Sequence, residues 1–170
     1  MSNRRQIELI QEHGLSADRI ASVRLTVGEN SYFLCGENKF VPPNSAEALW
    51  NHRYSVAVAC TKGEVFADSF TEEAIQDPEV KAFIPKVDVI PDASMRFEVQ
   101  VDVVTLDGKT LTKRLDDMEP VAKTNIIEKF EKCCRYAVSP LTEECIQDCI
   151  HIVDRLEELD DLEKLMKLLT

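Results

Sequence analysis

A period-two pattern of hydrophobic residues in the segment 95–115 constrains the fold more than any other feature of the chain. From residue 97 to residue 103 every second side chain is apolar, and the positions between them are acidic or amide side chains. Such alternation is typical of a strand with one buried face and one solvated face. Asp107-Gly108 then gives a two-residue turn signal with positive φ angles. The sequence therefore predicts an antiparallel hairpin of residues 95–105 and 109–116.

Further strands and helices are expected before this hairpin. Val23, Leu25 and Val27 alternate with polar residues as in a half-buried strand. The segment 28–43 contains two glycines and a pair of prolines without a sustained period, so it predicts a long surface loop. The other expected elements are a helix over 4–13, a helix over 46–61 with Asn44 as its cap, short helices beginning at Thr71 and at Asp77-Pro78, and a strand over 86–90.

The strand signals stop near residue 117, and only helical patterns follow. Cysteines and aliphatic residues recur at helical spacing over 124–137, 142–159 and 161–169. We expect residues 1–118 to form an α+β domain with a mainly antiparallel sheet packed against helices. Residues 119–170 are then expected to form a short all-α tail.

The charge balance excludes two classes of partner. The chain has a formal net charge of −11 and no run of basic residues, so neither a nucleic acid nor a membrane surface is an expected partner. No apolar run approaches the roughly 20 residues that span a bilayer, and the N-terminal residues show no secretory pattern. The sequence predicts a cytoplasmic protein.

Six cysteines raise the question of a metal site, with Cys145, Cys149 and His151 close together in sequence. On a helix Cys145 and Cys149 share a face, whereas His151 points away from them, and tetrahedral zinc needs convergent ligands. We interpret the cysteines as reduced thiols, mostly in cores. Because no glycine fingerprint for a nucleotide occurs either, we expect no metal and no cofactor.

The run from Asn51 to Tyr54 places four polar or half-polar side chains early in the expected apolar helix. Polar side chains depart here from the apolar pattern of the helix, and such a local departure from the expected pattern suggests a functional site. His52, Arg53 and Tyr54 are therefore candidates for contact with a ligand. The alternative is that Tyr54 lies at the edge of the core while His52 and Arg53 are solvated.

The same helix carries a resemblance to a known family. The stretch PPNSAEALWNHRYSVAVACTKGEVFADSFTEEAIQDPEVKAFIPKVDV resembles the lid-domain core of the MmgE/PrpD family, which includes 2-methylcitrate dehydratase, cis-aconitate decarboxylase and iminodisuccinate epimerase. The shared pattern is Trp50, then Tyr54-x-Val-Ala with Gly63 nine residues after the tyrosine, then Phe70, Asp77-Pro78-x-Val80 and Lys86-Val87. Family members usually have a serine or threonine at the position of Asn51 and often a proline at that of Arg53.

The resemblance implies a two-domain enzyme in which a large helical domain comes first and the C-terminal helices complete it. It also implies metal-free proton abstraction next to a carboxylate, with most of the catalytic groups in that helical domain and one tyrosine, matching Tyr54, in the lid. His52 and Arg53 are the expected substrate-binding residues. The chain would then be a shortened protein, a gene fragment or one subunit of a split enzyme.

Two functions of different classes follow from these observations. The first is the lid-and-tail part of a lyase or isomerase that acts on small polycarboxylates and is inactive alone. Its expected partner is a complementary helical subunit, or a further copy of the chain through self-association. The second is a stand-alone binding or interaction module that retains the lid fold without catalysis.

Overall fold

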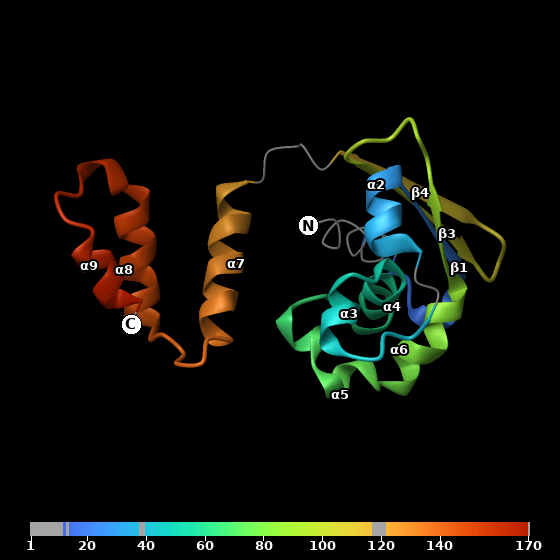
Figure 1. Cartoon of the computed structure of the whole chain (residues 1–170), viewed down its shortest axis with the longest axis horizontal. Helices are drawn as coiled ribbons and strands as arrows, with labels where there is room; N and C mark the ends of the chain where they lie inside the picture. The colour runs from blue at the N-terminus through green and yellow to red at the C-terminus, as the bar shows by residue number, and fades with distance from the viewer. Residues whose placement is uncertain (1–11, 13, 38–39, 117–121, 170) are drawn as a thin grey trace. The chain divides into compact units, whose positions relative to one another are not determined.

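The structure, a computed structural model, describes residues 12, 14–37, 40–116 and 122–169. The chain divides into two compact units, which we call the α+β unit (Met1–Glu119) and the helical unit (Pro120–Thr170) (Figure 1). The predicted α+β fold class is confirmed, because a mostly antiparallel sheet packs against helices and further helices follow it. The helix expected over residues 4–13 lies outside the described residues, apart from Glu12.

In the described part of the chain the sheet has four strands in the order β2-β1-β3-β4. β1 pairs antiparallel with β3 and parallel with β2, so one non-local parallel pairing joins an otherwise antiparallel sheet. β3 and β4 are the two strands of the predicted hairpin, and their antiparallel pairing confirms it. The strands are β1 (Ile20–Val27), β2 (Val87–Pro91), β3 (Glu98–Thr105) and β4 (Thr110–Asp116).

The turn of this hairpin differs from the predicted two-residue type. The backbone N–H of Thr105 donates to the carbonyl of Lys109, so the loop consists of Leu106, Asp107 and Gly108. Gly108 takes a φ of 83°, whereas Asp107 has no positive φ and accepts a hydrogen bond from the Thr105 hydroxyl. A three-residue hairpin loop needs only one residue in the left-handed region, and Gly108 supplies it.

The helix expected over residues 46–61 is in fact two helices, α3 (Ser45–Leu49) and α4 (His52–Lys62). Asn51 separates them, since its backbone is extended and its side chain caps the second helix. The apolar pattern continues across the break, which is why periodicity alone did not reveal it. From Arg53 to Cys60 every residue of α4 is buried, as expected for the central helix of the unit.

Residues 28–43 were expected to form a long surface loop, and this prediction is wrong for the first part of the segment. A short helix, α2 (Glu29–Ser31), runs into a π-helical turn, η2 (Tyr32–Gly36). A Cβ atom on Gly36 would lie 3.0 Å from the Val89 side chain and closer still to Tyr32, so this glycine permits tight packing against β2. In the sequence alone, the same glycine was interpreted as a sign of a loop.

The predicted helix starts at Thr71 and Asp77 are confirmed. The Thr71 hydroxyl accepts the backbone N–H of Ala74, and the Asp77 carboxylate accepts two backbone N–H groups of the next turn. The remaining helical elements of the unit are η1 (Ala17–Arg19), η3 (Ala67–Phe70), α5 (Glu72–Ile75), α6 (Pro78–Phe83) and η4 (Ile84–Lys86).

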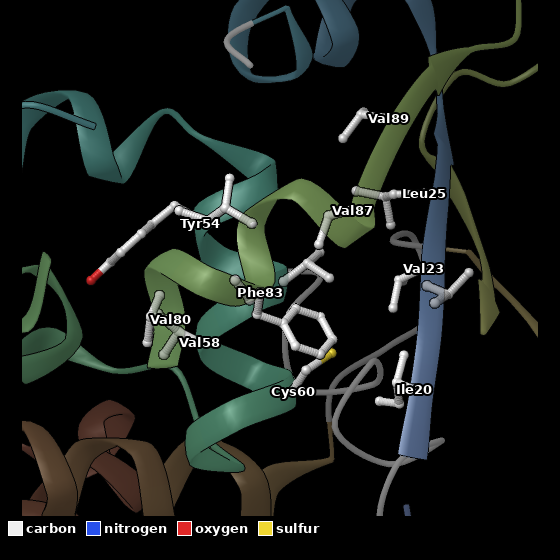
Figure 2. Packing of buried hydrophobic residues seen from close by; sticks show 14 of the residues in the cluster. Ile20, Val23, Leu25, Tyr54, Val58, Cys60, Val80, Phe83, Val87 and Val89 are labelled. Carbon is white, nitrogen blue, oxygen red and sulfur yellow. The ribbon is translucent and has the colours of Figure 1, made fainter. Parts of the chain in front are cut away.

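The hydrophobic core lies between the sheet and the helices α4 and α6. Figure 2 shows side chains of β1, including Val23 and Leu25, facing Phe83 of α6 and Cys60 of α4. All four are buried, and a fully buried aliphatic side chain stabilises a fold by about 1.5–3 kcal/mol. Phe97, expected on the buried face, is instead exposed, because β3 begins one residue later and the ring contacts Arg96.

The helical unit consists of α7 (Lys123–Arg135), α8 (Glu143–Asp154), a 3₁₀ turn η5 (Leu156–Glu158) and α9 (Glu163–Leu168). The helix predicted over 142–159 ends five residues early, because Arg155 leaves the helical conformation and its guanidinium pairs with Glu158. Lys123 pairs with Asp154 across α7 and α8. Among the helices of the described segments, none combines the length and the hydrophobicity that a membrane span requires.

Candidate functional site

The first turn of α4 carries the site residues predicted from the sequence, and Asn51 organises it. Its side-chain oxygen accepts the backbone N–H of Tyr54 at 2.9 Å, which caps the helix. Its side-chain nitrogen donates to the carbonyl of Phe40 at 3.1 Å, which ties the preceding segment to the helix start. Serine, threonine and asparagine are all good capping residues. Asn51 can therefore cap this helix in the same way as the serine or threonine that members of the resembled family usually have at this position.

His52, Arg53 and Tyr54 point in three directions, because successive helical residues are rotated by about 100°. His52 Nε2 lies 3.0 Å from the Ser31 hydroxyl on α2. The Arg53 guanidinium donates to the carbonyl of Gly36, and the Tyr54 hydroxyl donates to the carbonyl of Ser69. Thus His52 and Arg53 both contact the segment 31–36, whereas Tyr54 faces η3 on another side of the helix.

Tyr54 is a buried phenol with a hydrogen-bonded hydroxyl group. Its residue surface is 0% exposed, and its ring centroid lies 6.0 Å from that of Phe70. Figure 2 shows the side chain directed away from the β1 residues of the core. Burial, and then the negative charge of Asp77, raise the pKa of Tyr54 above its ordinary value. The hydroxyl therefore keeps its proton at neutral pH, so it can act as a hydrogen-bond donor or proton donor.

Tyr54 is one of the residues around a pocket of about 290 Å³, and the charges around this pocket are mainly negative. Lys62 is the cation among its described lining residues, and it pairs with Asp77 at 2.9 Å and with Glu79 at 2.8 Å. Glu64 and Asp68 add two more carboxylates to the lining. An anionic ligand would meet repulsion there, because the one positive charge is already matched by two negative ones.

His52 lies on another side of α4 and is electrically neutral. Burial lowers the pKa of His52 to about 4, and positive charges, that of Arg53 among them, add to this effect. At neutral pH the imidazole can exchange hydrogen bonds, as it does with Ser31, but it supplies no positive charge to a carboxylate.

Arg53 carries a full positive charge that the protein directs inward. The residue is 4% exposed, and its guanidinium lies 3.7 Å from the Asp88 carboxylate on β2 in addition to its bond with Gly36. Asp88 is shared with Arg24 of β1, also at 3.7 Å. These contacts hold η2 against the sheet edge.

Three residues of this arrangement were missed as site residues by the sequence reading. Asn51 was counted as a polar interruption, although an asparagine directly before an apolar helical run is a capping signal. Ser31 and Ser69 meet His52 and Tyr54 from 21 and 15 residues away in the chain. No local pattern in the sequence indicates such contacts.

No group of three or more histidine, cysteine, aspartate or glutamate side chains converges as a metal site within the part of the chain that is described. Cys60 is buried, and burial raises the pKa of its thiol to about 12, so it behaves as an apolar core residue. The absence of a metal and of a cofactor stays a prediction.

Comparison with known proteins finds one family model and curated relatives that match nearly the whole chain. The family model described as MmgE/PrpD C-terminal domain matches residues 6–155. Cis-aconitate decarboxylase of Mus musculus is 24% identical over 163 residues, which cover 90% of this chain and 32% of that protein. Cis-aconitate decarboxylase of Homo sapiens is 27% identical over 165 residues, which cover 91% of this chain and 33% of that protein. The chain thus spans about a third of the length of these curated relatives.

Proposed function

The chain belongs to the MmgE/PrpD family, and from this membership we propose that it is the lid part of a lyase or isomerase that acts on small polycarboxylates. The family match over residues 6–155 carries the proposal. The relatives' names point to cis-aconitate, which is a small polycarboxylate. Since the chain spans about a third of their length, we propose that turnover requires a complementary helical part.

The charges around the site support this dependence on a partner. Polycarboxylate substrates need cationic or strong hydrogen-bonding groups to hold them and to stabilise an enolate-like anion. Lys62 and Arg53 both face negative partners in their own unit, and His52 is neutral. The cations that bind the substrate therefore come from the complementary part.

Within the proposed enzyme Tyr54 is the catalytic residue of this chain. Its raised pKa suits it to donate a hydrogen bond or a proton to the anion that forms next to a carboxylate. Because the hydroxyl already donates to the carbonyl of Ser69, the substrate anion has to replace that carbonyl as the acceptor. His52 and Arg53 stay predicted substrate contacts: the observed partner of His52 is Ser31, and those of Arg53 are Gly36 and Asp88.

A chimera tests the proposal directly. The segment of human cis-aconitate decarboxylase that this chain matches is replaced by residues 6–155, and consumption of cis-aconitate and 2-methylcitrate is measured. We expect turnover by the chimera and none by the chain alone. Tyr54→Phe should lower kcat by about 100-fold or more, which is the usual contribution of a general acid.

Tyr136→Phe, which alters a half-exposed tyrosine of the helical unit, is the matched control and should leave kcat unchanged. Circular dichroism establishes that both variants fold. Robust turnover by the chain alone would contradict the need for a partner. Full activity of the folded Tyr54→Phe chimera would show that the catalytic role is misplaced.

A second candidate function is a stand-alone interaction module that keeps the fold without the reaction. It is favoured by large apolar side chains exposed beside α4, including Phe33, Phe40 and Trp50. A chimera that folds but turns over neither substrate would favour this candidate. The chain would then bind a partner of its own for another purpose.

A further inference from the structure

Four of the six cysteines lie in the helical unit, and three of these four are partly or fully buried. Cys134 of α7 is 6% exposed and Cys149 of α8 is 1% exposed, whereas Cys145, one turn before Cys149, is partly exposed. Cys133 is exposed, because adjacent helical residues point about 100° apart. All these thiols are free in the structure. We call Cys134, Cys145 and Cys149 the thiol cluster.

Two polar contacts define the register of α7 and α8. The Gln147 side chain donates a hydrogen bond to the Glu131 carboxylate at 3.3 Å, and Lys123 pairs with Asp154. The higher-numbered residue of one helix therefore lies near the lower-numbered residue of the other. The two helices lie side by side and run in opposite directions (Figure 1).

This register brings two members of the thiol cluster together. Cys134 follows Glu131 by three places, and Cys145 precedes Gln147 by two, so the two cysteines lie next to each other across the helix pair. Cys149 lies two places beyond Gln147 and is therefore opposite an earlier turn of α7. Burial first, and then the thiols of Cys134 and Cys145, raise the pKa of Cys149, so all three are within electrostatic reach of one another.

The members of the cluster differ in their access to solvent. Burial raises the pKa of Cys134, so its thiol stays protonated at neutral pH and reacts slowly with an oxidant. Cys145 is partly exposed, so a small molecule can reach its sulfur. An oxidant therefore meets Cys145 first, and the buried thiol of Cys134 is the neighbour that can complete the reaction.

We propose that Cys134 and Cys145 form an interhelical disulfide when a low-molecular-weight disulfide oxidises the chain, so that the α7–α8 pair is a redox-sensitive modification site. Cys145 attacks one sulfur of the oxidant, which releases one thiol and leaves a mixed disulfide on Cys145. Cys134 then gives up its proton and attacks the Cys145 sulfur, which releases the second thiol. The two protein thiols lose two electrons and two protons, and one oxidant molecule is reduced to two thiols.

The bond would act on the less stable of the two units. In the described part of the helical unit few side chains are deeply buried, and two of them belong to the thiol cluster. A bond between Cys134 and Cys145 would close a loop of about 12 residues across the turn that joins α7 and α8, which restricts the unfolded chain. Oxidation would therefore stabilise the helical unit without a change in the α+β unit.

Thiol counting in the full chain tests the proposal. Cys35→Ser and Cys133→Ser together remove the accessible thiols outside the cluster and leave four cysteines. This double variant is treated with excess oxidised glutathione, its remaining thiols are alkylated in denaturant, and the intact mass is measured. We expect the thiols to fall from four to two with no glutathione retained, and dithiothreitol to restore all four.

Single substitutions in the double variant identify the bonded pair. Cys134→Ser should leave a glutathione on Cys145, because the resolving thiol is missing. Cys145→Ser should slow the loss of thiols by about tenfold or more, because the other cluster members are buried. Cys149→Ser is the matched control and should leave the bond unchanged. Circular dichroism establishes that each variant folds, and fragmentation of the crosslinked peptide from the double variant identifies the bonded sulfurs without any change in the cluster.

Hydrogen exchange measures the effect of the bond. Oxidation should raise the protection of amides in α7 and α8 by about 30-fold or more, which corresponds to the lower end of typical disulfide stabilisation. Amides of β1 provide the internal control and should exchange at the same rate in both forms. Unchanged protection of α7 and α8 in the oxidised chain would contradict the proposed stabilisation.

Oxidation of the double variant in urea tests the role of the register, since unfolding removes it. The bond between Cys134 and Cys145 should then become a minor product. Four alkylated thiols after oxidation of the folded chain, a covalent dimer, or a bond other than that between Cys134 and Cys145 would overturn the proposal. An equal yield of this bond in the folded and unfolded chain would do the same.

Discussion

The two units of the chain differ in how completely they bury their apolar residues. In the α+β unit the sheet and the helices α4 and α6 enclose a continuous core, from Ile20 on β1 to Val103 on β3. In the described part of the helical unit only Cys134, Ile146 and Cys149 reach comparable burial. Both units consist of regular secondary structure, so regular helices and strands are not sufficient to bury the apolar side chains.

The exposed residues of the helical unit explain this difference. Apolar side chains cover a wide arc of each helix, and a neighbouring helix covers only part of such an arc. The large apolar side chains left exposed are Ile126, Tyr136, Val138, Val153, Leu156, Leu162, Met166 and Leu169. A unit of about 50 residues with so little burial is at the lower limit of independent stability. It is therefore expected to depend on a surface outside itself.

Separating the units is the strongest test of the comparison. We expect residues 1–119 to unfold cooperatively in urea and residues 120–170 to show weak helicity as a monomer, because isolated short helices are marginal in water. Circular dichroism of the two fragments measures both. A fragment 120–170 that folds as a cooperative monomer would remove the difference between the units.

The same dependence predicts that the intact chain associates at micromolar concentration or binds a separate helical protein. Light scattering tests the first part, and added leucine-to-serine changes at Leu162 and Leu169 should reduce the association. A strictly monomeric chain with a protease-resistant segment 122–169 would show that the helical unit is satisfied without a partner.

Equivalent core truncations in the two units sharpen the comparison. Leu25→Ala removes a side chain that is 1% exposed beneath α4 and should lower the free energy of unfolding by about 3–4 kcal/mol. Ile146→Ala, at 3% exposure in the helical unit, should change the main unfolding transition by less than about 1 kcal/mol, because that transition reports the larger core. Urea denaturation followed by Trp50 fluorescence isolates the α+β unit. Equal effects of the two substitutions would contradict separate stabilities.

The pH dependence of stability should also lie mainly in the α+β unit. The pKa of His52 falls from 6.5 to about 4 on folding, chiefly through burial. Between these values the unfolded chain binds a proton that the folded chain does not, so the free energy of unfolding decreases as the pH falls. We expect His52 to contribute a loss of about 2–3 kcal/mol from pH 7 to pH 4.

Comparison with His52→Gln isolates this contribution from that of the carboxylates, which titrate in the same range. The matched control, His151→Gln, replaces an exposed imidazole of the helical unit and should leave the transition reported by Trp50 fluorescence unchanged at pH 7, because Trp50 lies in the other unit. If the free energy of unfolding of the unaltered chain and of His52→Gln decreases equally from pH 7 to pH 4, the burial of a neutral His52 does not contribute to the pH dependence of stability.

The structural features that depend on local patterns, such as a hairpin or a helix start, could be predicted from the sequence. The hairpin of β3 and β4 was predictable because alternation and the Asp107-Gly108 turn both lie within one short segment. The helix starts at Thr71 and Asp77 were predictable because a capping side chain acts within its own turn. The break at Asn51 was not found, since the apolar pattern runs across it.

The candidate site was less predictable, because its contacts join distant segments. The sequence indicated His52, Arg53 and Tyr54 as one cluster, but the helical rotation sends them to Ser31, Gly36 and Ser69. The parallel pairing of β1 with β2 was missed for the same reason. Which residues face a common ligand depends on such non-local contacts.

The smallest expected difference concerns two helix caps, one in each unit. Asn51→Ala removes the cap of α4 and the hydrogen bond to the part-buried carbonyl of Phe40, so we expect the α+β unit to lose about 1–2 kcal/mol. Thr142→Ala removes only the bond from its hydroxyl to the backbone N–H of Cys145 at an exposed helix start. It should change the same transition by less than about 0.5 kcal/mol while lowering the helicity of residues 143–154. Urea denaturation by Trp50 fluorescence and hydrogen exchange of α8 measure the two effects separately. Comparable losses in the fluorescence transition for both variants would mean that the two units unfold together, and the difference in burial would then not translate into a difference in stability.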